Sequence, residues 1–175
     1  MRGFSLLELI ISLSIFSILT TIFIANFRGG EQQRVLEFSS QNIVGVLEKA
    51  RVWAVSGKTK DSSIPSGGYG VRISKCIEPP CDVTLFEDKD GDGKLDYSDE
   101  EEMEGDSYIL PLDIIIENVS TSGDMDVVFK GPRPLICVNR ECPSSSDPEI
   151  TLKNIRNSSI KKIVINQRTG QIIIK

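Results

Sequence analysis

The beginning of the chain is the feature that most limits what the sequence can fold into. Residues 4–27, FSLLELIISLSIFSILTTIFIANF, contain one charged residue, Glu8. A helix rises 1.5 Å per residue, so this stretch spans roughly 36 Å, enough to cross a hydrocarbon core of about 30 Å. It therefore predicts a membrane-spanning helix.

The alternative for such a terminus is a secretory signal that is removed from the mature protein. Signal peptides combine a basic start, a shorter apolar run and a cleavage site of small residues. Here the basic start is only Met1 and Arg2, the apolar run is too long, and a small-x-small site is lacking. These features favour a membrane helix over a cleaved signal.

Glu8 is expensive to place in a bilayer, by at least about 2 kcal/mol for a carboxylate at the centre, and such residues usually have a partner. Arg2 lies six positions away, and no cationic side chain lies within one helical turn of Glu8. The partner is therefore expected outside this helix.

The residues around Glu8 resemble a known processing signal. Residues 2–9, RGFSLLEL, are similar to the leader of type IV pilins and type II secretion pseudopilins. The resemblance implies that a prepilin peptidase cuts after Gly3 and methylates the new amine of Phe4. It also implies that Glu8 is required for assembly. Methylation leaves the amine charged, so Glu8 of one subunit could pair with Phe4 of a neighbour in a dry helical bundle.

The second half of the expected helix is amphipathic. Its apolar positions are Leu36, Ile43, Val46, Leu47, Ala50, Trp53 and Ala54. Gly57 is the expected C-cap, and Gly29 and Gly30 are expected to form a bend or a locally melted point. The apolar face should lie on a sheet.

Beyond residue 66 the pattern changes to the two-residue period of β-strands. Short β-rich runs are found at residues 69–74, 83–86, 108–116, 126–129, 135–138, 150–155, 161–165 and 171–174. Pro111 argues for an edge or a bulge, and residues 167–170 for a hairpin turn.

The predicted class is α+β, a pilin-like fold with a long N-terminal helix followed by an antiparallel β-sheet domain. Residues 47–51, 68–71 and 163–170 look like the H-type minor pseudopilins. The expected divisions are a leader at 1–3, a transmembrane assembly helix at 4–27, its amphipathic continuation at 28–57, and an extracytoplasmic β domain at 58–175.

The charge pattern points to a cation site. The net charge is −5, yet residues 87–106 contain 11 acidic and 2 basic residues, so the rest of the chain is slightly basic.

The sequence has no histidine, which removes the most common general base and the imidazole metal ligand. We therefore predict that the chain is not an enzyme.

Residues 88–99, DKDGDGKLDYSD, resemble an EF-hand or dockerin calcium loop. The predicted Ca²⁺ ligands are Asp88, Asp90, Asp92, the backbone carbonyl of Lys94, Asp96 and Asp99, with Glu100 as a possible substitute for the last. Gly93 permits the sharp turn, and Leu95 is expected to point inward as an anchor. A solvated Asp/Gly turn is the alternative, but the number of matched positions favours calcium. A single loop of this kind suggests a dissociation constant of about 10⁻⁴ to 10⁻³ M.

The four cysteines form two C-x4-C units, Cys76 with Cys81 and Cys137 with Cys142. Of the three possible connectivities, the local pairing is favoured. A four-thiolate zinc site is the alternative, but it usually shows C-x2-C spacing. Disulfides indicate an oxidising compartment, so they place the β domain outside the cytoplasm, which the flanking charges alone do not decide.

The carboxyl end, residues 153–175, carries six basic and no acidic residues. Such a strip can bind nucleic acid, but outward lysines on edge strands explain it better, because the strip lacks aromatic residues for stacking.

The predicted function is a structural filament subunit. It would span the inner membrane once and then enter a pilus or a periplasmic pseudopilus, with prepilin peptidase and other pilin subunits as partners. The alternatives are a DNA- or surface-binding minor pilin and a membrane-anchored calcium-binding module.

Overall fold

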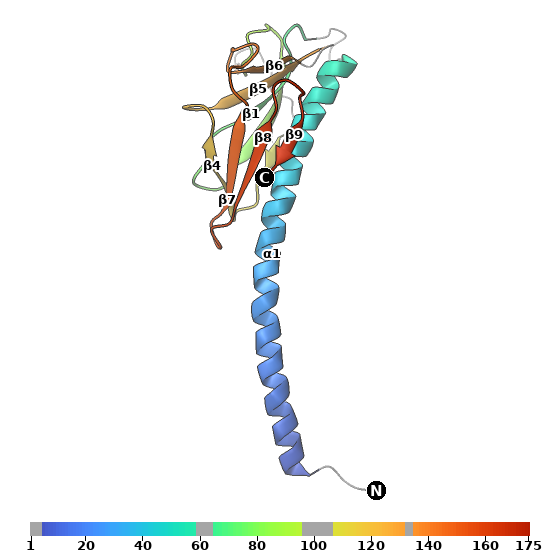
Figure 1. Ribbon diagram of the computed structural model, residues 1–175, viewed down its shortest axis with the longest axis vertical. Helices are drawn as coiled ribbons and strands as arrows, with labels where there is room; N and C mark the ends of the chain where they lie inside the picture. Colours follow the sequence, from blue (N-terminus) through green and yellow to red (C-terminus); the bar gives the residue numbers. More distant parts are fainter. Residues whose placement is uncertain (1–4, 59–64, 96–106, 132–134) are drawn as a thin grey trace.

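The computed structural model describes residues 5–58, 65–95, 107–131 and 135–175, apart from the side chains of residues 25–29. One long helix, α1, is followed by a head of antiparallel strands. The head lies beside the C-terminal half of α1, while the N-terminal half extends away from it (Figure 1). The α+β pilin-like architecture expected from the sequence is confirmed.

Helix α1 runs without interruption over Leu6–Ser56. The Ser5 side chain caps its start by accepting from the Leu7 amide, and Gly57 ends it in the left-handed conformation, with φ 63°. The locally melted point considered for Gly29 and Gly30 was wrong, because α1 continues through both. Each glycine costs about 1 kcal/mol of helix stability relative to alanine but still donates its backbone amide. The helical hydrogen bonds on both sides therefore continue through the two glycines.

The N-terminal half of α1 is long and apolar enough to cross a membrane, as the sequence predicted. The segment Leu6–Ile24 has a mean hydropathy of 2.2, and none of it is buried in the protein. Its hydroxyl groups donate to the carbonyl four residues earlier, at Ser12, Ser14, Thr20 and Thr21. These four hydroxyl groups therefore find partners within the helix, as a bilayer requires.

The second half of α1 supplies one wall of the core. Buried side chains recur along one face at Leu36, Ile43, Leu47, Ala50 and Ala54. This face contacts strands of both sheets, so helix and sheets share one cluster of buried apolar residues. The amphipathic helix predicted from the sequence is thus confirmed.

The described part of the head forms two sheets rather than one. The first has the order β3-β2-β1-β5-β6, formed by β1 (Gly68–Ile73), β2 (Asp82–Asp88), β3 (Tyr108–Ile109), β5 (Met125–Lys130) and β6 (Leu135–Val138). The second has the order β4-β7-β8-β9, formed by β4 (Ile114–Val119), β7 (Glu149–Asn154), β8 (Ile160–Ile165) and β9 (Ile172–Ile174). All pairings between these strands are antiparallel.

The division between the sheets falls at Pro111. The run at residues 108–116, expected as one strand, is split into β3 and β4, which belong to different sheets. Proline has no amide hydrogen to give to a ladder, and the Pro111 carbonyl instead accepts from the Ile114 amide in a tight turn. The hairpin turn predicted at 167–170 lies between β8 and β9, where Gly170 donates to the Asn166 carbonyl.

Polar contacts also attach the head to α1. Asn154 is buried and donates to the Gln32 carbonyl over 3.2 Å, and Arg51 donates to the Gly170 carbonyl over 2.7 Å. Between these points Lys161 pairs with Glu37 at 2.8 Å, and this hydrogen bond lowers the pKa of the Glu37 carboxyl.

Substitutions on the buried and the exposed face of α1 should differ in their effect on the free energy of unfolding. We expect Leu47→Ala to lower the free energy of unfolding by about 2–5 kcal/mol, because Leu47 is fully buried. Val52→Ala, on the exposed side of the same helix, should change it by less than about 0.5 kcal/mol. Denaturant unfolding of the detergent-solubilised chain, followed by Trp53 fluorescence, measures both. Equal effects would contradict this packing.

Candidate functional site

The acidic loop begins at the last residue of β2, Asp88, whose side chain is 0% exposed. Its Oδ1 accepts from the Gly91 amide at 2.8 Å, and its Oδ2 accepts from the Gly93 amide at 3.0 Å. Gly93 has φ 81°, a conformation that favours glycine. The loop therefore curls around the Asp88 carboxylate.

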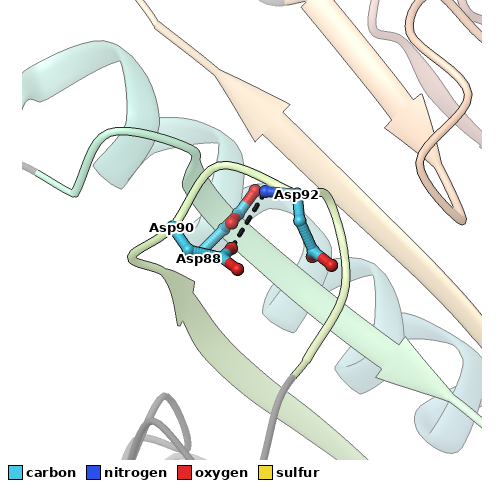
Figure 2. A group of neighbouring side chains, drawn as sticks. All are labelled: Asp88, Asp90 and Asp92. Carbon is cyan, nitrogen blue, oxygen red and sulfur yellow. Dashed lines mark hydrogen bonds between the residues drawn. The ribbon is translucent and has the colours of Figure 1, made fainter.

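Two further aspartates point into the same loop (Figure 2). Asp90 Oδ1 accepts from the Asp92 amide at 2.9 Å, and Asp92 Oδ1 accepts from the Lys94 amide at 2.8 Å. Asp88, Asp90 and Asp92 each offer a carboxylate oxygen, and these oxygens lie within 4.8 Å of one another. An all-oxygen, all-anionic group of this size suits a hard cation such as Ca²⁺.

The loop is packed against the head through Leu95. This side chain is buried with Phe86, Val128 and Cys137, as expected for an inward anchor. The Arg72 guanidinium also donates to the Leu95 carbonyl at 2.9 Å, while it pairs with Asp126. Together these contacts hold the loop at Leu95 against the first sheet.

Two basic side chains lie beside the aspartates, and spacing in the sequence gave no sign of them. Lys130 donates to the Gly91 carbonyl at 2.8 Å, with its Nζ 3.9 Å from Asp88 Oδ2. Arg140 donates through Nε to Asp92 Oδ2 at 2.9 Å. Both come from the β5–β6 region, far along the chain, so only the tertiary fold brings them to the loop.

Burial dominates the electrostatics of Asp88. Loss of water raises its pKa from 3.8 to about 6, against the opposing effects of the two glycine amides and Lys130. A carboxylate that is this costly to bury benefits from a nearby cation.

The described residues contain only part of the predicted ligand set. Asp88, Asp90 and Asp92 come together, and Lys94 follows them directly in the loop. Asp96, Asp99 and the alternative Glu100 lie outside the described residues. Three of the predicted carboxylates are therefore placed as a group, and the remaining ligands stay a prediction.

Both disulfides have the local connectivity that the spacing favoured. Cys76–Cys81 closes the connection between β1 and β2, and Cys137–Cys142 closes the turn after β6. Cys137 is also one of the residues that bury Leu95. The second disulfide thus supports the wall on which the acidic loop rests.

Comparison with protein families matches residues 1–24 to the prokaryotic N-terminal methylation motif. The chain carries a type IV pilin-type N terminus. Its long helix followed by antiparallel sheets agrees with this. No curated protein and no solved structure was found to match the chain. Because the family match ends at residue 24, the similarity to H-type minor pseudopilins stays a prediction.

Of the predicted processing and assembly residues in this pilin-like chain, Glu8 is described and Gly3 and Phe4 are not. Glu8 lies in the first turn of α1, on an exposed part of the helix. Negative charge is favourable there because the first helical amides lack partners within the helix. Glu8 is thus placed where a neighbouring molecule can reach it.

The basic carboxyl end is largely neutralised in the pilin-like head. Four of its six cations pair with carboxylates: Lys153 with Glu117, Arg156 with Asp113, Lys161 with Glu37, and Lys162 with Glu149. This arrangement favours a structural role over a strip that binds phosphate backbones. The expected place on edge strands was wrong, however, because Lys153 lies on β7 and Lys161 and Lys162 lie on β8, which are inner strands of the second sheet.

The raised pKa of Asp88 predicts a specific pH dependence. In chelator-treated protein the folded state keeps a proton on Asp88 up to about pH 6, whereas the unfolded state loses it near 3.8. Between these values the folded state binds more protons, so this group makes stability fall as pH rises. Relative to Asp88→Asn, the Tm of the unmodified protein should drop by roughly 5 °C across that window. If the Tm of the two proteins changed with pH in the same way, the raised pKa of the buried Asp88 carboxyl would be contradicted.

Proposed function

We propose that the chain is a structural, non-enzymatic subunit of a type IV pilus or a type II secretion pseudopilus. The observation that carries this proposal is the match of residues 1–24 to the methylation motif, at the start of a helix that is apolar and unburied as far as Ile24. A side-chain surface of this kind needs either lipid or other helices around it.

Processing begins while the chain is anchored in the inner membrane. Prepilin peptidase cuts after Gly3, which has no side chain to obstruct the approach of a protease to the backbone. The same enzyme then methylates the amine of Phe4, which keeps its positive charge. The two disulfides support a head on the extracytoplasmic side, since such bonds persist in oxidising compartments.

Assembly places Glu8 against the methylated Phe4 amine of a neighbouring subunit. The apolar side chains around Glu8 exclude water once helices bundle, so an unpaired carboxylate there is costly. A pair with the neighbour's amine removes that cost only when the two helices are in register. Glu8 therefore contributes specificity of alignment as well as attraction.

The acidic loop holds a Ca²⁺ ion that orders one end of the head. Asp88, Asp90, Asp92 and the Lys94 carbonyl bind it, joined by Asp96 and by Asp99 or Glu100. In support, each of the three grouped carboxylates already accepts a loop amide, which leaves acceptor capacity for a cation. Binding offsets the repulsion among the aspartates and adds stability by mass action.

Removing the Glu8 carboxylate tests the assembly step. We expect Glu8→Ala to be inserted and cleaved normally but to be absent from sheared or pulled-down filaments. The reason is that the Phe4 amine of the neighbouring subunit no longer finds a carboxylate to pair with. Glu31→Ala removes another exposed carboxylate from the same helix and should assemble as the unmodified chain does. Immunoblots of membrane and filament fractions measure both. Normal incorporation of Glu8→Ala would refute the pairing of Glu8 with the neighbour's amine. Absence of the unmodified chain from the filament fraction would refute the filament proposal and leave a simple membrane anchor.

Calcium titration tests the metal site. With a dissociation constant of about 10⁻⁴ to 10⁻³ M, 10 mM Ca²⁺ should add about 1.4–2.7 kcal/mol of stability. Calorimetry and thermal melts should both lose this response in Asp90→Ala. Asp124→Ala removes an exposed carboxylate outside the loop and should keep the response. Absence of Ca²⁺-dependent heat in the unmodified protein would refute the site.

A further inference from the structure

One end of the head faces the membrane half of α1 and exposes a group of aliphatic side chains. Figure 1 shows that the β7–β8 turn lies at this end. Leu112 is 69% exposed, Ile155 49% and Ile160 50%. We call these three residues the head tip. Single exposed aliphatic residues are ordinary, whereas several at the same end of a domain form a candidate contact surface.

The head tip is held in place by polar contacts. The Ile155 amide donates to the Asp113 carbonyl at 2.9 Å, which joins the β7–β8 turn to the segment that carries Leu112. Next to them, the Arg156 guanidinium pairs with Asp113 at 2.7 Å. The aliphatic side chains therefore project from a fixed base.

The position of the head tip along α1 follows from Asn154. Its buried side chain donates to the Gln32 carbonyl at 3.2 Å, and Asp113 and Arg156 line a cleft with Gln32. The head tip thus lies at about the level of Gln32. Among the described side chains the apolar span reaches Ile24, eight residues earlier, so the vertical separation is at most about 12 Å in a continuous helix.

This separation brings the head tip close to lipid. Each headgroup layer is about 5–7 Å thick beyond the hydrocarbon core. Membrane helices tilt by about 20° on average, and a tilt toward the side of the head lowers the head tip further. Because α1 has no break between span and head, the head moves with the helix.

We propose that the head tip rests in the headgroup layer of the membrane before the subunit is assembled. This inference depends on the membrane stage of the proposed function. Aliphatic side chains at this depth gain from leaving water, and the cost of ordering is small because their base is already fixed. The contact selects the tilt that turns the β7–β8 side of the head toward the lipid.

The test uses the full-length chain in phospholipid vesicles brominated near the headgroup, since bromine quenches nearby tryptophan. In a Trp53→Phe background, Leu112→Trp places the only tryptophan at the head tip, where the exposed site tolerates it. We expect about a twofold loss of its fluorescence relative to unbrominated vesicles. Native Trp53 is the control, because it lies about 32 Å further along α1 than Gln32 and should be unchanged.

A second variant separates this inference from membrane anchorage. Phe16→Trp in the same background lies within the apolar span and reports insertion through bromine placed deeper in the chains. Quenching at positions 16 and 112, at low protein-to-lipid ratio, supports the proposal. Quenching at 16 alone overturns the head-tip contact and leaves anchorage intact. No quenching at 16 overturns both. Quenching at 112 that requires crowded protein indicates contact with a second copy and also overturns the proposal.

Discussion

The rest of the structure depends on the continuity of α1. The same helix offers a fully exposed apolar surface over Leu6–Ile24 and a one-sided buried face from Leu36 to Ala54. Its first half can be satisfied only by lipid or by other helices, whereas its second half is satisfied by its own head. Because one rigid element carries both, the orientation of the head is set by whatever surrounds the first half. The placement of the first half of α1 therefore also determines the position of the head.

The acidic loop brings several negative charges close together. Asp88 ends a central strand in a buried position, and two more aspartates follow within four residues. Loop amides, Lys130 and Arg140 offset part of this charge, while Leu95 and the Cys137–Cys142 disulfide fix the support beneath. The described part of the loop, Asp88 to Leu95, is therefore held by protein contacts, and the proposed cation would neutralise the negative charge that these contacts leave. This arrangement fits a structural role better than a sensor that changes shape.

Patterns between residues close in the sequence predicted the features that depend on short-range interactions. Apolar length gave the membrane half of α1, the 3.6-residue period gave its buried face, Gly57 gave its end, and C-x4-C spacing gave both disulfides. The continuation of the helix over 28–57 was predicted, but the melted point considered at Gly29 and Gly30 gave single-residue propensity too much weight against the cooperativity of a long helix. The split into two sheets, the pairing of Arg140 with Asp92, and the Asn154 contact with Gln32 were beyond prediction. They join residues far apart in the chain, and no spacing rule encodes them.

The contacts between head and helix are spread from Gln32 to Arg51, and this distribution has a mechanical consequence. A force that pulls the head along the axis of α1 loads the Asn154, Lys161 and Arg51 contacts in parallel, together with the apolar face between them. A force that pulls the head sideways would instead open these contacts one after another, beginning at either end. The same bonds therefore resist axial tension far better than peeling, which gives the head a strong and a weak direction relative to its own helix.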